Sequence, residues 1–194
     1  LLLASNLPPA SIPNYKLKRL FEIVSQHKKT VIFTQFIDVG RYLTNELSFL
    51  YPNQVIRLYA SDPKASKPVL SMSQRHQLLS DFLYDSNINI GVFSINLAAE
   101  SIDLNVADSV IFYDLPWQAM KIQQAIHRAV RPGNPHKLIH LYFLSHHGFI
   151  DEHQYKLFEE KIKASKTMMD VEIPDIIQTK DAIEVIKCSL GELI

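Results

Sequence analysis

The stretch DSVIFYDLPWQAMKIQQAIHRAVRPGNPHKLIHLYFL, residues 108–144, decides the fold class. Residues 108–114 and 137–144 are short, continuous apolar runs, which are typical of strands buried on both faces of a sheet. Residues 119–130 between them are predicted to form a helix, which Pro132 and Gly133 would end. The stretch therefore predicts a strand–helix–strand unit with a parallel pair of strands.

The same alternation continues toward the N-terminus. Residues 96–101 are predicted to form a loop or a single helical turn. We expect helices over 15–26, 37–50 and 74–85, and strands over 30–36, 54–60 and 88–95. This order predicts an α/β fold, a doubly wound parallel sheet with helices on both faces. Such sheets bind ligands at the carboxyl ends of their strands. Functional residues are therefore expected in the loops after 36, 60, 95 and 114, and in residues 124–134.

The two ends of the chain have a different character. Residues 1–14 contain three prolines and no charged residue, which is typical of a linker. Residues 149–168 are predicted to form another helix, and a short helix is expected near 179–190. The sequence thus predicts one lobe over 15–148 and a C-terminal helical extension over 149–194.

Composition excludes several classes of protein. The 194 residues are 47% hydrophobic, and the 20 basic and 20 acidic residues cancel, which is typical of a soluble globular domain rather than a disordered or fibrous chain. No apolar run reaches the roughly 18 residues of a membrane-spanning helix. Cys188 is the only cysteine, so a disulfide within the chain and a cysteine-based zinc site are excluded, and a reducing compartment is expected.

The zero net charge hides a basic region. Residues 115–150 contain no Asp or Glu. A local positive potential can serve phosphate binding even in a neutral protein, although a chance fluctuation is the alternative interpretation. The region also contains five histidines, and Asp151, Glu152 and His153 follow it, but no HExxH motif occurs. We interpret these residues as polar side chains between a strand and a helix, and predict no metal site.

Phosphate-binding loops are absent from the sequence. None of the five glycines lies in a GxxxxGK[ST] or GxGxxG motif, and no GxSxG elbow is present. Arg128 and Arg131 offer a different type of phosphate contact. Their spacing predicts one shared helical face, with Gln124 one turn earlier, and planar guanidinium groups suit bidentate contacts to phosphate oxygens. On spacing alone, a solvated basic helix face is the favoured interpretation, and the context of the pair has to decide.

The order of these segments resembles the second RecA-like lobe of superfamily 2 helicases and translocases. The frame Gln124, Arg128, Arg131 and Gly133 is similar to motif VI of the Swi/Snf-like group, and His127 onward is similar to the DEAD-box form. Residues 95–116 resemble motif V and the strand after it. The resemblance covers about residues 15–145, and its other segments are TVIFTQF (30–36, motif IV), the helix with Gln74 and Arg75 (motif IVa) and KLKRLFEIV (16–24, the opening helix).

The resemblance implies a role for each candidate residue. ATP and Mg²⁺ would be held mainly by a separate N-terminal RecA-like lobe, and Arg131 would be the arginine finger, with Arg128 as its partner. Gln124 and His127 would lie near the nucleotide, and Asp103 near the ribose or the arginines. Double-stranded DNA is expected as substrate rather than RNA, and the residues expected toward its backbone are Thr34, Gln35, Arg75, Ser94 and Asn96.

Departures from the family pattern leave two functions open. Ser101 stands where the family has glycine, Ile95 replaces the Thr or Ser of motif V, Glu100 adds an acid, and Asn134 replaces a Gln or Arg. The first hypothesis is the C-terminal lobe of an ATP-dependent DNA translocase, part of an ATPase and inactive alone. The alternative is a degenerate lobe that serves as a non-catalytic DNA-binding or protein-interaction module in a chromatin-type complex. Both imply an intracellular protein without membrane contact, in the bacterial cytoplasm or the eukaryotic nucleus, with further protein partners.

Overall fold

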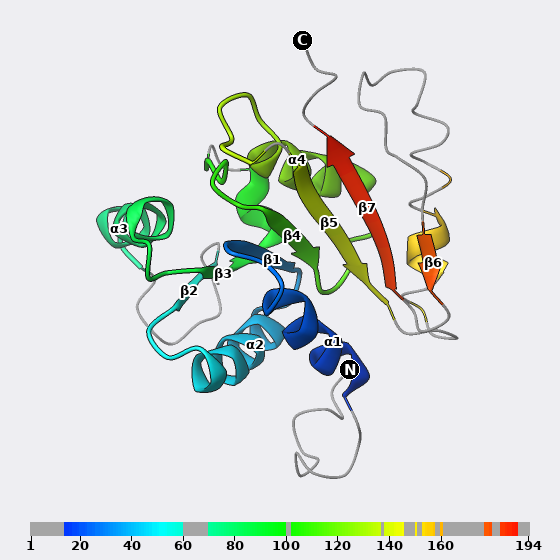
Figure 1. Ribbon diagram of the computed structural model, residues 1–194, viewed down its shortest axis with the longest axis horizontal. Coiled ribbons are helices and arrows are strands. Elements are labelled where there is room, and N and C mark those ends of the chain that lie inside the picture. The colour runs from blue at the N-terminus through cyan, green and yellow to red at the C-terminus, as the bar shows by residue number, and fades with distance from the viewer. Residues whose placement is uncertain are drawn as a thin grey trace.

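A computed structural model describes residues 14–59, 70–99, 102–136, 138–145, 150, 153–157, 160, 177–179 and 183–189. Its strands form one sheet in the order β2-β3-β1-β4-β5-β7-β6 (Figure 1). The strands are β1 (Thr30–Thr34), β2 (Val55–Leu58), β3 (Ile90–Ser94), β4 (Ser109–Phe112), β5 (Leu138–Leu144), β6 (Ile177–Thr179) and β7 (Ile183–Ser189). The helices are α1 (Tyr15–Val24), α2 (Ile37–Leu50), α3 (Met72–Tyr84), α4 (Ala119–Ala129) and the 3₁₀ helix η1 (Ile95–Ala99).

The elements predicted between residues 15 and 144 are confirmed. The first five strands all pair in parallel, with β1 at the centre between β3 and β4. No predicted end differs from the observed end of its helix or strand by more than two residues. The apolar runs were read as slightly longer than the hydrogen-bonded strands, because the residues that enter and leave a buried strand are apolar too.

Helices cover both faces of the sheet. On one face, α1 and α2 pack through Leu20, Leu43 and Leu47 against strand residues such as Ile32 and Val92. On the other face, α3 and α4 pack against a second core, whose residues include Phe82, Phe33, Phe93, Phe112, Ile122 and Ala125. Figure 1 shows α1 and α2 together on one side of the sheet and α4 on the other. Burial on both faces explains why the strands are continuously apolar instead of alternating.

The C-terminal segment differs from the prediction. Residues 183–189 form strand β7, which pairs antiparallel with β5, and β6 pairs antiparallel with β7. The short helix expected near 179–190 is therefore wrong. The β-branched residues Ile183, Val185 and Ile186 favour a strand, and the otherwise unpaired edge of β5 supplies hydrogen-bond partners.

Two further predictions concern the ends of the chain. Residues 150, 153–157 and 160 are helical, within the helix predicted over 149–168. The remainder of that helix and residues 1–13 of the predicted linker lie outside the described residues. Within the described part of the chain, no helix has the length and apolar character that crossing a membrane requires.

A half-buried carboxylate joins three elements at the amino edge of the sheet. The Asp108 carboxylate accepts hydrogen bonds from the backbone amides of Lys28 (2.9 Å) and Lys29 (3.0 Å), and lies 3.6 Å from Nδ1 of His27. Nε2 of His27 in turn lies 2.8 Å from the hydroxyl of Tyr142 on β5. Burial acts to raise the pKa of Asp108, but His27 and the two amides together outweigh it and lower that pKa to about 2.

Replacing Asp108 by Asn should destabilise the fold in a pH-dependent manner. At pH 7 the free energy of unfolding should fall by about 1–3 kcal/mol, because one of the two backbone amides loses its bond to a charged acceptor. A lowered folded-state pKa stabilises the protein above the unfolded value of 3.8, and this contribution is lost as the pH falls toward 2. The difference between the wild-type chain and D108N should therefore shrink between pH 4 and pH 2 in urea unfolding followed by circular dichroism.

Asp38 provides the matched control for this measurement. Its side chain is 90% exposed and lies 3.2 Å from Arg41 in a surface ion pair. D38N should change the free energy of unfolding by less than about 1 kcal/mol at every pH, as exposed ion pairs contribute little. Equal effects of D38N and D108N would contradict the role given to Asp108.

Candidate functional site

Helix α4 carries most of the predicted nucleotide-site residues. Its buried residues Ile122, Ala125 and Ala129 recur at helical spacing and face the sheet. Gln124 and His127 are exposed, and Arg128 is half-buried. The apolar stripe therefore orients α4 so that this polar face points away from the core.

Arg131 is not part of this helix. α4 ends at Ala129, and Val130 already has an extended backbone with φ −86° and ψ 90°. The expectation that Arg128 and Arg131 share a helical face is therefore wrong. Pro132 disfavours the helical conformation of the residue before it, and Gly133 then adopts a left-handed φ of 93° in the turn toward β5.

The side chain of Arg131 nevertheless returns to α4. Its Nε donates a 2.9 Å hydrogen bond to the backbone carbonyl of His127. Cations are favoured at a helix C-terminus, where carbonyl groups lack partners within the helix. Arg131 is half-buried, and its bond to His127 keeps the guanidinium beside the last turn of α4, the turn that contains Arg128. Both arginines thus belong to the same end of α4 although they do not share a helical face.

Residues 102–107 pack against this end of α4. The amide of Leu104 donates to the carbonyl of Arg128 at 3.0 Å. Asn134 donates through Nδ2 to the carbonyls of Ala129 (3.0 Å) and Ala107 (3.1 Å). Asn134 was noted in the sequence only as a departure from the family pattern. Its partner Ala107 lies 27 residues earlier in the chain, so no local signal in the sequence could have identified this role.

Asp103 lies on the same segment. It is exposed, and its Oδ1 accepts a 3.3 Å hydrogen bond from the amide of Asn105 in a local turn. The bond between Leu104 and Arg128 brings the segment of Asp103 to the arginines of α4. The structure thus gathers four of the predicted nucleotide-site residues, Asp103, His127, Arg128 and Arg131, at one end of the helix, with Gln124 one turn before Arg128.

The predicted nucleic-acid residues lie mainly at the carboxyl edge of the sheet. Thr34 and Ser94 are register partners at the ends of β1 and β3. Thr34 is 0% exposed, and its hydroxyl donates to the carboxylate of Asp114, which also accepts the amide of Gln35. Ser94 is only 4% exposed. Both side chains are therefore buried within this edge, and their hydroxyls are not exposed at the surface.

Other side chains form the surface of the carboxyl edge. Asn96 of η1 is exposed, and its Oδ1 accepts a 2.8 Å hydrogen bond from Nζ of Lys121 in the first turn of α4. Gln35 is half-buried. Arg75 is also half-buried and lies in the first turn of α3. Lys121, which was not among the predicted site residues, therefore joins Asn96 and Gln35 in one polar surface.

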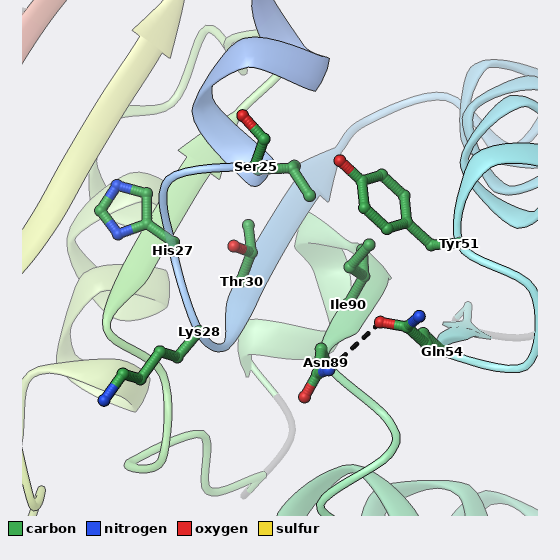
Figure 2. A pocket seen from close by; sticks show the side chains of 9 residues that line it. Ser25, His27, Lys28, Thr30, Tyr51, Gln54, Asn89 and Ile90 are labelled. Carbon is green, nitrogen blue, oxygen red and sulfur yellow. Dashed lines mark hydrogen bonds between the residues drawn. The ribbon is translucent and has the colours of Figure 1, made fainter.

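A cavity of about 380 Å³ lies at the amino edge of the sheet. Figure 2 shows Tyr51 pointing toward Ser25 across it, and Asn89 bonded to Gln54 at its lower side. None of the predicted site residues lines this cavity. In the described part of the chain, no group of three or more His, Cys, Asp or Glu residues could hold a metal ion. His146, His147, Asp151 and Glu152 lie outside the described residues.

Comparisons with known proteins agree with this architecture. A family model described as "Helicase conserved C-terminal domain" matches residues 15–133. Helicase SWR1 of Cryptococcus neoformans is 31% identical over 162 residues, which cover 79% of this chain and 12% of that protein. Human chromatin-remodeling ATPase INO80 is 29% identical over 117 residues, 59% of this chain and 8% of INO80. The chain thus spans only about a tenth of the length of these curated relatives.

A solved structure supports the same fold. The C-terminal part of the Fun30 ATPase domain superposes with a TM-score of 0.65 at 25% sequence identity. The match covers 73% of this chain and 44% of the Fun30 chain. Fold and sequence therefore point to the same family.

The Thr34–Asp114 pair should be energetically coupled. A double-mutant cycle with T34V, D114A and the double variant tests this, because Asp114 accepts from both the Thr34 hydroxyl and the Gln35 amide. D114A should cost about 1–3 kcal/mol, and the coupling energy with T34V should be at least about 0.5 kcal/mol. The measurement is urea unfolding of the four proteins. Additive effects would show that the bond does not stabilise the carboxyl edge.

Proposed function

This chain belongs to the helicase conserved C-terminal domain family, as a Swi/Snf-like lobe of superfamily 2, and we propose that it supplies the arginine finger of an ATP-driven DNA translocase. In this proposal ATP and Mg²⁺ are held mainly by a separate N-terminal RecA-like lobe. The chain by itself hydrolyses no ATP. Its task is to bring guanidinium groups to a nucleotide that the other lobe binds.

The observation that carries this proposal is the pair of arginines at the end of α4. Arg131 is anchored there through Nε, which leaves the two terminal nitrogens of its guanidinium to donate toward a ligand. Such donors stabilise the negative charge that develops on a transferred phosphoryl group. The chemistry fits phosphate oxygens, and the described residues include no carboxylate cluster for Mg²⁺. Two arginines beside the single carboxylate of Asp103 suit a lobe that completes a nucleotide site held by another lobe.

Family resemblance also motivates a second surface in the proposal. Gln35, Asn96 and Lys121 at the carboxyl edge would contact the backbone of double-stranded DNA, with Arg75 of α3 as a further contact. Contacts to phosphate and sugar fix the position of the duplex and carry no sequence information. Thr34 and Ser94 would act indirectly, because their side chains are buried and support the backbone of that edge.

A specific observation favours the alternative function. Ile95 stands where the family has a hydroxyl-bearing residue in motif V, and it is 1% exposed, within the core. The neighbouring Ser94 is buried as well. A lobe with this motif V could serve as a non-catalytic DNA-binding or protein-interaction module in a chromatin-type complex. The two relatives described above, a helicase and a chromatin-remodeling ATPase, suit either function, and the second favours a place in the nucleus.

Replacing Arg131 by Ala in the full-length protein should abolish ATP hydrolysis. We expect kcat to fall by about 10³-fold or more, the magnitude typical of arginine fingers. Nucleotide binding should change little, because the N-terminal lobe would supply most of the contacts. The measurements are phosphate release with saturating DNA and binding of a fluorescent ATP analogue.

Arg19 provides the matched control for Arg131. It is an arginine on α1, on the opposite face of the sheet, in a surface pair with Glu22. R19A should keep wild-type hydrolysis. Normal hydrolysis by R131A would show that Arg131 is not the finger. A wild-type protein that binds DNA in a salt-dependent manner but never hydrolyses ATP would favour the non-catalytic module.

A further inference from the structure

One polar side chain closes the turn after α4. Asn134 is half-buried, and both ends of its amide are engaged. Its Nδ2 donates to the carbonyls of Ala129 (3.0 Å) and Ala107 (3.1 Å), and its Oδ1 accepts the amide of His136 at 2.8 Å. The backbone amide of Asn134 donates to the backbone carbonyl of Arg131 at 3.1 Å. Asn134 therefore bonds α4, the segment before β4, the turn itself and His136, two residues before β5.

The position of Arg131 depends on few other contacts. It lies beyond the last helical residue, so the hydrogen-bond ladder of α4 does not hold its backbone. Gly133 lies in open space, since a side chain added there would meet no atom within 4 Å. The turn is therefore open at Gly133, whereas Val130, just before Arg131, is buried in the core. Beyond Val130, the bonds of Asn134 and the bond from Arg131 to His127 hold the turn and the guanidinium.

Helix α4 is also bonded at its other end. In its first turn, Lys121 donates to Asn96 of η1 at the carboxyl edge of the sheet. At its last turn, the carbonyl of Arg128 accepts the amide of Leu104, and Asn134 donates to the carbonyl of Ala107. Asn134 therefore closes the end of α4 that carries the arginines.

We propose that Asn134 is a positioning residue for the arginine finger. By donating hydrogen bonds to the carbonyls of both Ala129 and Ala107, it holds the turn that carries Arg131 in a fixed position against residues 102–107. The inference rests on the proposed role of Arg131. Asn134 itself touches no nucleotide. Its loss shifts the guanidinium and lowers the rate of hydrolysis, while ATP, held by the other lobe, binds as before.

Two variants of Asn134 in the full-length protein test the proposal. N134A removes all three side-chain bonds, whereas N134D keeps the shape and the acceptor for the His136 amide and loses the two donated bonds. Both should lower kcat by about 10–100-fold, because misplacement of a catalytic group by about 1 Å costs about that much. The KM for ATP should stay within about twofold of the wild-type value, as an interaction made only in the transition state requires.

S109A is the stability-matched control. It removes a 2.8 Å hydrogen bond between two buried hydroxyls, Ser109 and Thr30, which lies away from α4. S109A should lower the melting temperature about as much as N134A and leave kcat unchanged. An equal loss of kcat in S109A and N134A would overturn the proposal, because the effect would then be one of general stability.

Two further measurements separate this inference from the proposed function. If Asn134 acts through Arg131, adding N134A to R131A should lower the residual rate no further. Hydrogen exchange of the Leu104 amide should accelerate at least about tenfold in N134A and not in S109A, since the segment is released from α4. If R131A hydrolyses ATP slowly but N134A has a normal kcat, the positioning role of Asn134 is wrong and the proposed role of Arg131 stands. If R131A hydrolyses ATP normally, the proposed role of Arg131 is wrong, and the role of Asn134 is wrong with it.

Discussion

The burial of β1 on both faces is the constraint on which the rest of this structure depends. β1 pairs with β3 on one side and β4 on the other, and all of its residues are buried. A central parallel strand must be reached through crossovers, so α1 and α2 cover one face and α3 and α4 the other. This arrangement brings the ends of β1, β3 and β4 to one edge, and it sends α4 back across the sheet toward the start of β5.

The two ends of α4 lie at two different polar surfaces of the lobe. Its first turn, with Lys121, meets η1 at the carboxyl edge, where a polar surface suits a nucleic-acid backbone. Its last turn, with Arg128 and the returning Arg131, meets residues 102–107, where guanidinium groups suit phosphate oxygens. Helix α4 is thus bonded to η1 at its first turn and to residues 102–107 at its last turn.

Sequence patterns predicted much of this, and their failures have physical causes. The strands and helices between 15 and 144 followed from apolar periodicity, since that pattern reports burial directly. Segment 183–189 was misread because a short alternating stretch becomes a strand only where a free edge, here that of β5, accepts it. Thr34 was expected at a surface, but the carboxylate of Asp114, 80 residues away in sequence, buries its hydroxyl.

The sequence by itself determined the class of fold, the order of the strands and helices between residues 15 and 144, and the presence of two arginines without a phosphate loop. These depend on local patterns: apolar runs, helical spacing and turn residues. Only the tertiary structure decided that Arg131 leaves the helix and returns to the carbonyl of His127, and that Asn134 joins α4 to Ala107. Those features depend on hydrogen bonds whose partners are brought together by the packing of α4 on the sheet, which no local pattern encodes.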